Sequence, residues 1–109
     1  MGKKVINIER DFSRYPAGRY QDDGPYSGEK FRAEFLVPAL SQNPDGVVIE
    51  LDGARGLGSS FLEEAFGGLV RLGHPAQELL KQLELKTEDA SLIEEINSYI
   101  LEAKVGERQ

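Results

Sequence analysis

The sequence predicts a small α/β domain, in which a mixed sheet of four or five strands packs against helices. Short runs of alternating apolar residues are interspersed with longer runs at the three- and four-residue spacing of amphipathic helices. One run, "VVIEL", is β-branched and almost entirely apolar, as expected for a central strand covered on both faces. The 109 residues suffice for one hydrophobic core, so we expect a single domain over residues 1–109.

The first half of the chain predicts a strand, a turn-rich connection and a helix. Alternating apolar residues favour a strand at residues 5–8. Glycine and proline punctuate the following segment, which has room for a short second strand at residues 18–21. A helix is expected from Ser27, its N-cap, and Pro38 should kink or end it. The apolar face of this helix consists of Phe31, Phe35, Leu36 and Leu40.

The second half continues the alternation after an "NPDG" turn and the central strand. A second helix should begin near Ser60, and a short helix is expected at residues 75–80. The alternating "QLELK" predicts a strand at residues 82–86, and Thr87 or Asp89 should cap a last helix. We expect the core to contain Val47, Ile49, Leu51, Leu62, Phe66, Leu69, Leu83, Leu85, Ile93 and Ile96.

Composition excludes several classes of function. A formal net charge of −6 disfavours nucleic acid as a partner, because phosphate-backbone affinity requires clustered Lys and Arg. The chain has no cysteine and one histidine, so we expect no metal site and no cofactor. No apolar segment approaches the roughly 20 residues of a membrane span, and we expect a cytoplasmic protein without membrane contact.

The segment "LDGARGLGSSFLEEAFGGLVR" carries the strongest functional signal. Gly53 and Gly58 have the spacing of the phosphate-binding pattern G-x-x-x-x-G-K-[ST], and Ser60 falls on its hydroxyl position. Ser59 stands where the pattern has its lysine, so the charge that holds the β and γ phosphates is missing. The turn therefore argues against a nucleotide-hydrolysing loop and leaves a serine presented at a helix start.

Two uses of the Ser60 hydroxyl are compatible with this position. Ser60 and Glu63 have the spacing of a capping box, in which each side chain accepts from the other's backbone N–H. A helix start also tolerates an added phosphate, because its free N–H groups and dipole favour an anion.

The residues that follow Ser60 and the loop at residues 15–26 can each be interpreted as structural or as functional. Glu63 and Glu64 are expected on a solvated helix face. The "GG" pair at residues 67–68 costs roughly 1 kcal/mol per glycine in a helix, which indicates close packing on the sheet or close approach of a partner. The loop at residues 15–26 either forms part of an interface or covers the sheet edge, with Arg19 paired to an aspartate. Its aromatic and charged residues are Tyr15, Arg19, Tyr20, Asp22, Asp23 and Tyr26.

The "VVIELDGARGLGSSFLEEAFGGLVR" segment resembles the core of the STAS domain of anti-sigma factor antagonists, where a central strand leads into a D-S-S-G-L type motif. Ser59 and Ser60 match the two serines, so the resemblance implies that Ser60 is the phosphorylated position, with Ser59 as the neighbouring candidate. Gly58 stands where the motif has aspartate, and Phe61 replaces its small glycine. The surface facing a kinase therefore differs in charge and bulk.

"RYPAGRY", "GPYSGEKFRAEFLVPAL" and "SSFLEEAFGGLVR" resemble more closely the STAS-like domain-of-unknown-function family, over nearly the whole chain. This resemblance implies a non-enzymatic regulatory or interaction domain, paired with a kinase-like protein of the histidine-kinase ATPase superfamily. We expect the partner-binding residues to be Arg55, Gly58 and Phe61, with Tyr20 and Arg19 from the preceding loop. The alternative is a small-molecule or nucleotide-sensing module at the same turn, residues 52–60, with Arg55 as the anion ligand.

Overall fold

The computed structural model describes residues 3–106, which form an α/β domain around a three-stranded sheet. The strands are β1 (Lys4–Asn7), β2 (Val47–Glu50) and β3 (Leu83–Lys86). They lie in the order β1-β2-β3, and both pairs are parallel. The expectation of a mixed sheet with four or five strands is therefore wrong for the described residues.

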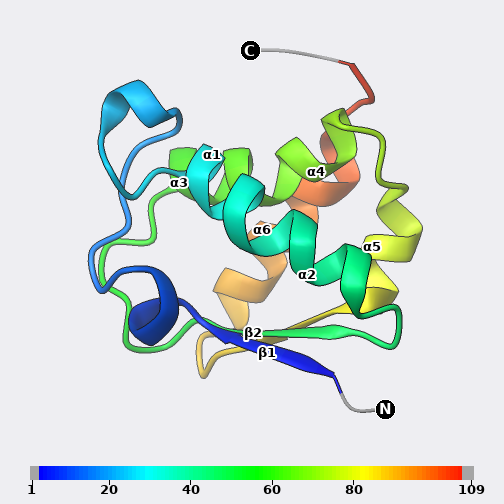
Figure 1. Cartoon of the computed structure of the whole chain (residues 1–109), viewed down its shortest axis with the longest axis horizontal. Coiled ribbons are helices and arrows are strands. Elements are labelled where there is room, and N and C mark those ends of the chain that lie inside the picture. Colours follow the sequence, from blue (N-terminus) through cyan, green and yellow to red (C-terminus); the bar gives the residue numbers. More distant parts are fainter. Residues whose placement is uncertain (1–2, 107–109) are drawn as a thin grey trace.

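The helices labelled in Figure 1 lie on one side of the sheet, so the described part of the chain has two layers. Ile6 and Ile49 are adjacent in the register on the covered face and are almost fully buried. On the opposite face Val5 is 42% exposed, and Glu84 forms an ion pair with Lys3 at 2.9 Å. Charged side chains thus occupy part of the face that the helices leave uncovered.

The first helical region runs from Gly28 to Gln42 through three consecutive segments. These are α1 (Gly28–Phe31), the π-helical turn η3 (Arg32–Leu36) and α2 (Val37–Gln42). The Ser27 hydroxyl accepts a hydrogen bond from the backbone N–H of Lys30, which confirms the predicted cap. Pro38 does not end the helical region, which continues to Gln42; it lies at the start of α2, directly after the π-helical turn η3.

The second helical region follows the same pattern from Ser59 to Arg71. It consists of α3 (Ser59–Leu62), the π-helical turn η4 (Glu63–Gly67) and α4 (Gly68–Arg71). A Cβ atom at Gly28 would overlap the carbonyl oxygen of Phe61, so glycine allows α1 to approach α3 closely. The two π-helical turns contact each other across this helix pair.

The remaining helices frame β3. Helix α5 (Ala76–Gln82) leads directly into the strand, and α6 (Ala90–Glu102) follows it. The Asp89 carboxylate caps α6 by accepting from the N–H of Ser91 at 3.0 Å. Of the two predicted caps for this helix, Asp89 is therefore the correct one.

Short helical turns occupy the chain between β1 and α1, namely η1 (Ile8–Phe12) and η2 (Gln21–Asp23). The strand expected at residues 18–21 is absent from the described structure. The Asp23 carboxylate instead accepts hydrogen bonds from the N–H groups of Arg19 and Tyr20, which closes the segment into a turn.

The core agrees with the sequence pattern at all but two of the expected positions, since only Leu85 and Ile93 are merely half-buried. Phe66 and Leu69, in the second helical region, are fully buried. A second group of packed rings surrounds Phe12, whose neighbours are Tyr26, Phe31, Phe35 and Phe61. Within residues 3–106, no helix is both long and apolar enough to cross a membrane.

Candidate functional site

The serine turn, defined as residues 52–60, lies at the carboxyl end of the central strand β2. Gly53 and Gly56 have φ values of 102° and 69°, a region that favours glycine over residues with a Cβ atom. The Asp52 carboxylate accepts from the Thr87 hydroxyl at 2.6 Å and from the Glu88 N–H at 3.0 Å. Asp52 therefore fastens the serine turn to the chain that follows β3.

The helix after the serine turn begins two residues earlier than a Ser60 cap requires. Gly58 is the N-cap residue, and its carbonyl accepts from the Leu62 N–H at 3.0 Å, while no side chain caps this end. Ser60 lies at the second helical position, and the Glu63 carboxylate is bound by arginines. The predicted capping box of Ser60 and Glu63 is therefore wrong.

Both serines are exposed, as is Gly58. The Ser59 hydroxyl interacts with the phenol of Tyr99, whose own OH donates to Glu95 at 2.6 Å. Within the described residues, the Ser60 hydroxyl has no hydrogen-bond partner. Of the two phosphorylation candidates, Ser60 is therefore the one whose hydroxyl is not already engaged.

Phe61 does not belong to the exposed surface. Its side chain is 1% exposed and packs against the rings of Phe12 and Phe31. Its prediction as a partner-binding anchor is wrong. Phe61 is the third residue of α3, and its side chain points into the core. Replacing it with alanine would remove core volume at a cost of about 3–5 kcal/mol, so the substitution reports on folding.

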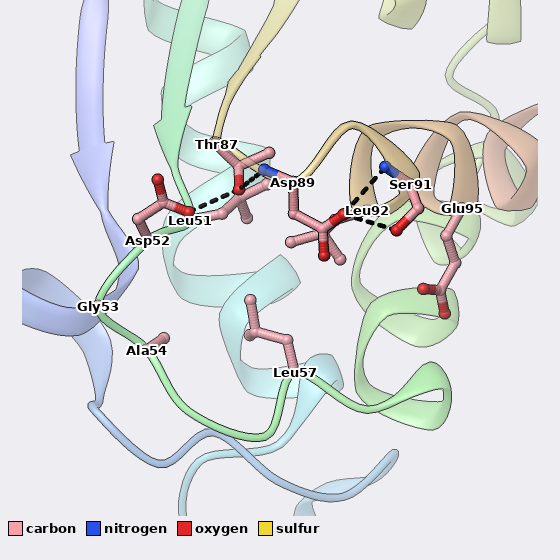
Figure 2. Close-up of a pocket in the computed structure, with 10 residues that line it drawn as sticks. All are labelled: Leu51, Asp52, Gly53, Ala54, Leu57, Thr87, Asp89, Ser91, Leu92 and Glu95. Carbon is pink, nitrogen blue, oxygen red and sulfur yellow. Dashed lines mark hydrogen bonds between the residues drawn. The ribbon is translucent and has the colours of Figure 1, made fainter.

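A polar cavity of about 370 Å³ opens beside the serine turn, at the ends of β2 and β3 (Figure 2). Carboxylates of Asp52, Asp89 and Glu95 line it together with hydroxyl and apolar side chains, and none of its lining residues is basic. Such a lining attracts cations and repels phosphate. Arg55, the expected anion ligand, is exposed and is not among the lining residues; its N–H donates to the Arg14 carbonyl at 2.7 Å.

Five charged side chains, from the loop before α1 and from the two helical regions, gather into one cluster. We call them the ion cluster: Arg19, Arg32, Glu63, Glu64 and Arg71. Glu63 binds Arg19 at 2.5 Å and Arg71 at 2.6 Å, and Glu64 binds Arg32 at 2.6 Å and Arg71 at 3.2 Å. These side chains are 8–23% exposed, so the expected solvated face at Glu63 and Glu64 is wrong.

The ion cluster explains the paired glycines. A Cβ atom at Gly68 would overlap the guanidinium of Arg32, and one at Gly67 would lie 2.7 Å from a Glu63 carboxylate oxygen. Arg32 also donates to the backbone carbonyl of Glu64 at 2.6 Å, within the π-helical turn. Close packing, one of the two explanations for "GG", is therefore what the structure shows, although the packed groups are charges and not the sheet.

Burial and the arginines act in opposite directions on Glu63. Burial alone would raise its pKa, but the hydrogen bonds from Arg71 and Arg19 outweigh that effect and hold the pKa below its ordinary range. Glu63 therefore remains a carboxylate, which suits a permanent ion pair and not proton transfer. Sequence patterns missed this cluster because Arg19 and Arg32 are distant from the glutamates along the chain; the helix-disfavouring glycine pair was the only local signal.

The loop at residues 15–26 contributes Arg19 to the ion cluster, so Arg19 pairs with a glutamate and not with an aspartate. Tyr20 is half-buried and lies close enough to Arg71 to contribute to the raised pKa of that guanidinium, which places it beside the same cluster. Tyr15 is 63% exposed and Tyr26 42% exposed, although the Tyr26 ring still contacts Phe12. The sequence-predicted residues thus fall into two groups, with Arg19 and Tyr20 at the cluster and Arg55, Gly58, Ser59 and Ser60 at the serine turn.

A parallel sheet whose central strand leads through a glycine turn into a serine-bearing helix defines a small α/β domain of the STAS-like class. The chain belongs to the family described as "STAS-like domain of unknown function (DUF4325)", whose model matches residues 27–92. This confirms the resemblance found in the sequence. Neither the comparison with curated proteins nor that with solved structures finds a match.

Proposed function

We propose that the chain is a non-enzymatic regulatory domain, which binds a protein partner through the serine turn and is switched by phosphate on Ser60. Membership of a STAS-like family supports the regulatory class. The observation that carries the proposal is the exposed Ser60 hydroxyl, which has no hydrogen-bond partner in the described residues and lies in the first turn of a helix. Phosphate there removes no cap and gains from the helix dipole.

The proposed partner is a histidine-kinase-type ATPase, which would also supply the phosphate. In the transfer, the Ser60 oxygen forms a bond to the γ-phosphorus of ATP, the bond from that phosphorus to the bridging oxygen breaks, and ADP leaves. The hydroxyl proton passes to solvent or to a base of the partner. The partner surface would comprise the exposed residues Arg55, Gly58 and Ser59 around Ser60.

The alternative is a small-molecule or nucleotide-sensing module at residues 52–60, and the acidic cavity of Figure 2 weighs against its nucleotide form. The carboxylates of the cavity would face the phosphates of a nucleotide with no base among the lining residues to compensate. The proposal also assigns no catalysis, no cofactor, and no nucleic-acid or membrane partner to this acidic chain.

The test is an affinity capture from the cytoplasm of the native cell, comparing the parent with Ser60→Asp. Ser91→Asp with Asp89→Gly is the matched control, since Ser91 also occupies the second position of a helix, has glutamates three and four residues later, and then follows a glycine cap as Ser60 does. We expect the parent and the control to retrieve a histidine-kinase-type ATPase and Ser60→Asp to lose it. Equal retrieval by all three chains, or no such ATPase with the parent, would overturn the proposal.

A further inference from the structure

The ion cluster carries a surplus positive charge. Three guanidinium groups face two carboxylates, and all five side chains are mostly buried. The buried Nε of Arg32 has no hydrogen-bond partner within the described structure. Charges removed from water are normally balanced by partners, so the cluster can accommodate one more anion.

Ser60 lies about one helical turn before the two glutamates of the cluster. Glu63 and Glu64 follow it by three and four residues, the spacing that places side chains side by side on an α-helix. Ser60 is exposed, while Glu63 already holds Arg19 at 2.5 Å. A phosphate attached to Ser60 would therefore be a neighbour of the Arg19–Glu63 pair.

Arg19 is the guanidinium best placed to change partner. Its side chain is 23% exposed, against 11% for Arg71 and 12% for Arg32. Arg71 makes three hydrogen bonds to the two glutamates and Arg32 makes two to Glu64, whereas Arg19 makes one. The Arg19 backbone is fixed, because its carbonyl accepts from the Glu29 N–H, so only the side chain needs to move.

We propose that the ion cluster reads phosphate on Ser60: Arg19 leaves Glu63 and pairs with the phosphate, while Glu63 retains Arg71. The inference rests on the proposed function, in which Ser60 is the modified residue. Phosphate carries about −1.5 to −2 charges and binds guanidinium in a two-pronged geometry, so it competes well with a single carboxylate. After the exchange, the exposed surface at Ser59 and Ser60, which was neutral, carries a phosphate paired with a guanidinium.

The test uses the full chain with phosphoserine incorporated at position 60 during synthesis, and measures the second pKa of the phosphate by phosphorus NMR. A guanidinium partner favours the dianion, so we expect this pKa to fall below its ordinary value of about 6. Arg19→Gln should return it toward that value, and Arg19→Lys should preserve part of the shift. An identical phosphate pKa with Arg19 and with Gln at position 19 would overturn the proposal.

A second comparison needs no change at Arg19. Phosphoserine at position 91 has the same helical position and is likewise followed by glutamates after three and four residues, but Glu94 and Glu95 have no ion pair with a base among the described residues. Asp89→Gly in this control matches its cap to Gly58. The phosphate at 60 should have the lower pKa, and equal values would contradict the proposal. Because phosphoserine is introduced directly, these outcomes are independent of whether the capture experiment finds an ATPase.

Discussion

Gly68→Ala distinguishes a glycine required by packing from a glycine required by a partner. The backbone at Gly68 has φ −59° and ψ −26°, which alanine adopts freely. The added methyl group would nevertheless overlap Nη1 of Arg32 and lie 2.9 Å from its Cζ. The guanidinium must therefore move away from the Glu64 carboxylate and carbonyl, which it contacts at 2.6 Å.

The magnitude follows from two opposing effects. Alanine is favoured over glycine inside a helix by about 1 kcal/mol. Breaking a buried ion pair costs about 3–5 kcal/mol, and the lower half of that range applies because Glu64 keeps Arg71 at 3.2 Å. The net loss is about 2–3 kcal/mol. With an unfolding entropy of about 2.1 cal/mol/K per residue over 109 residues, Tm should fall by roughly 9–13 °C.

Urea unfolding followed by far-ultraviolet circular dichroism measures this loss as a lower midpoint at unchanged slope. Arg32→Met provides the second arm of a double-mutant cycle, because it leaves no charge for the methyl group to displace. In that background Gly68→Ala should be neutral or stabilising. If Gly68→Ala alone were as stable as the parent, the packing explanation would be wrong and close approach of a partner would again account for the glycine.

Two further predictions concern pH. The hydrogen bond to Glu95 and burial raise the pKa of Tyr99 to about 12. The contribution of Tyr99 to the stability of the fold is therefore complete below pH 10.0 and is lost as the pH rises through about 12. Ultraviolet titration should show one late tyrosine, which Glu95→Gln makes earlier; four tyrosines ionising together would contradict this. The pKa of Glu63 is lowered in the fold, so its contribution to folding stability is complete above pH 4.5 and is lost as the pH falls below 4.5 and through the lowered pKa. Urea midpoints should therefore fall less steeply in acid for Arg71→Gln than for the parent, and parallel losses would refute the assignment.

The sequence pattern correctly predicted those features that depend on interactions between residues close together in the chain. Ser27 and Asp89 cap helices because their side chains reach backbone N–H groups within three residues. The central strand and the buried face of the second helix followed from periodicity. The additional strand near residues 18–21 failed, since the Asp23 side chain supplies hydrogen bonds that a neighbouring strand would have supplied.

The sequence predicted where the two serines lie but not which side chains the neighbouring glutamates bind. The serines are exposed at a helix start, as the sequence indicated. The capping box failed because the Glu63 carboxylate is bound by Arg19, 44 residues away, and by Arg71. A short pattern such as Ser-x-x-Glu contains no information about such distant partners, which only the folded chain brings together.

Arg19 differs from the rest of the ion cluster in its place along the chain, because it lies before residue 27, where the family match begins. Arg32, Glu63, Glu64 and Arg71 all lie within residues 27–92, the segment that the family model covers, and these four are electrically neutral together. They can hold the two helical regions together without help from the preceding loop. Arg19 supplies the surplus charge from outside that segment. In this chain, replacing Arg19 should therefore cost less stability than replacing any one of the other four, which would leave a buried charge without its partner.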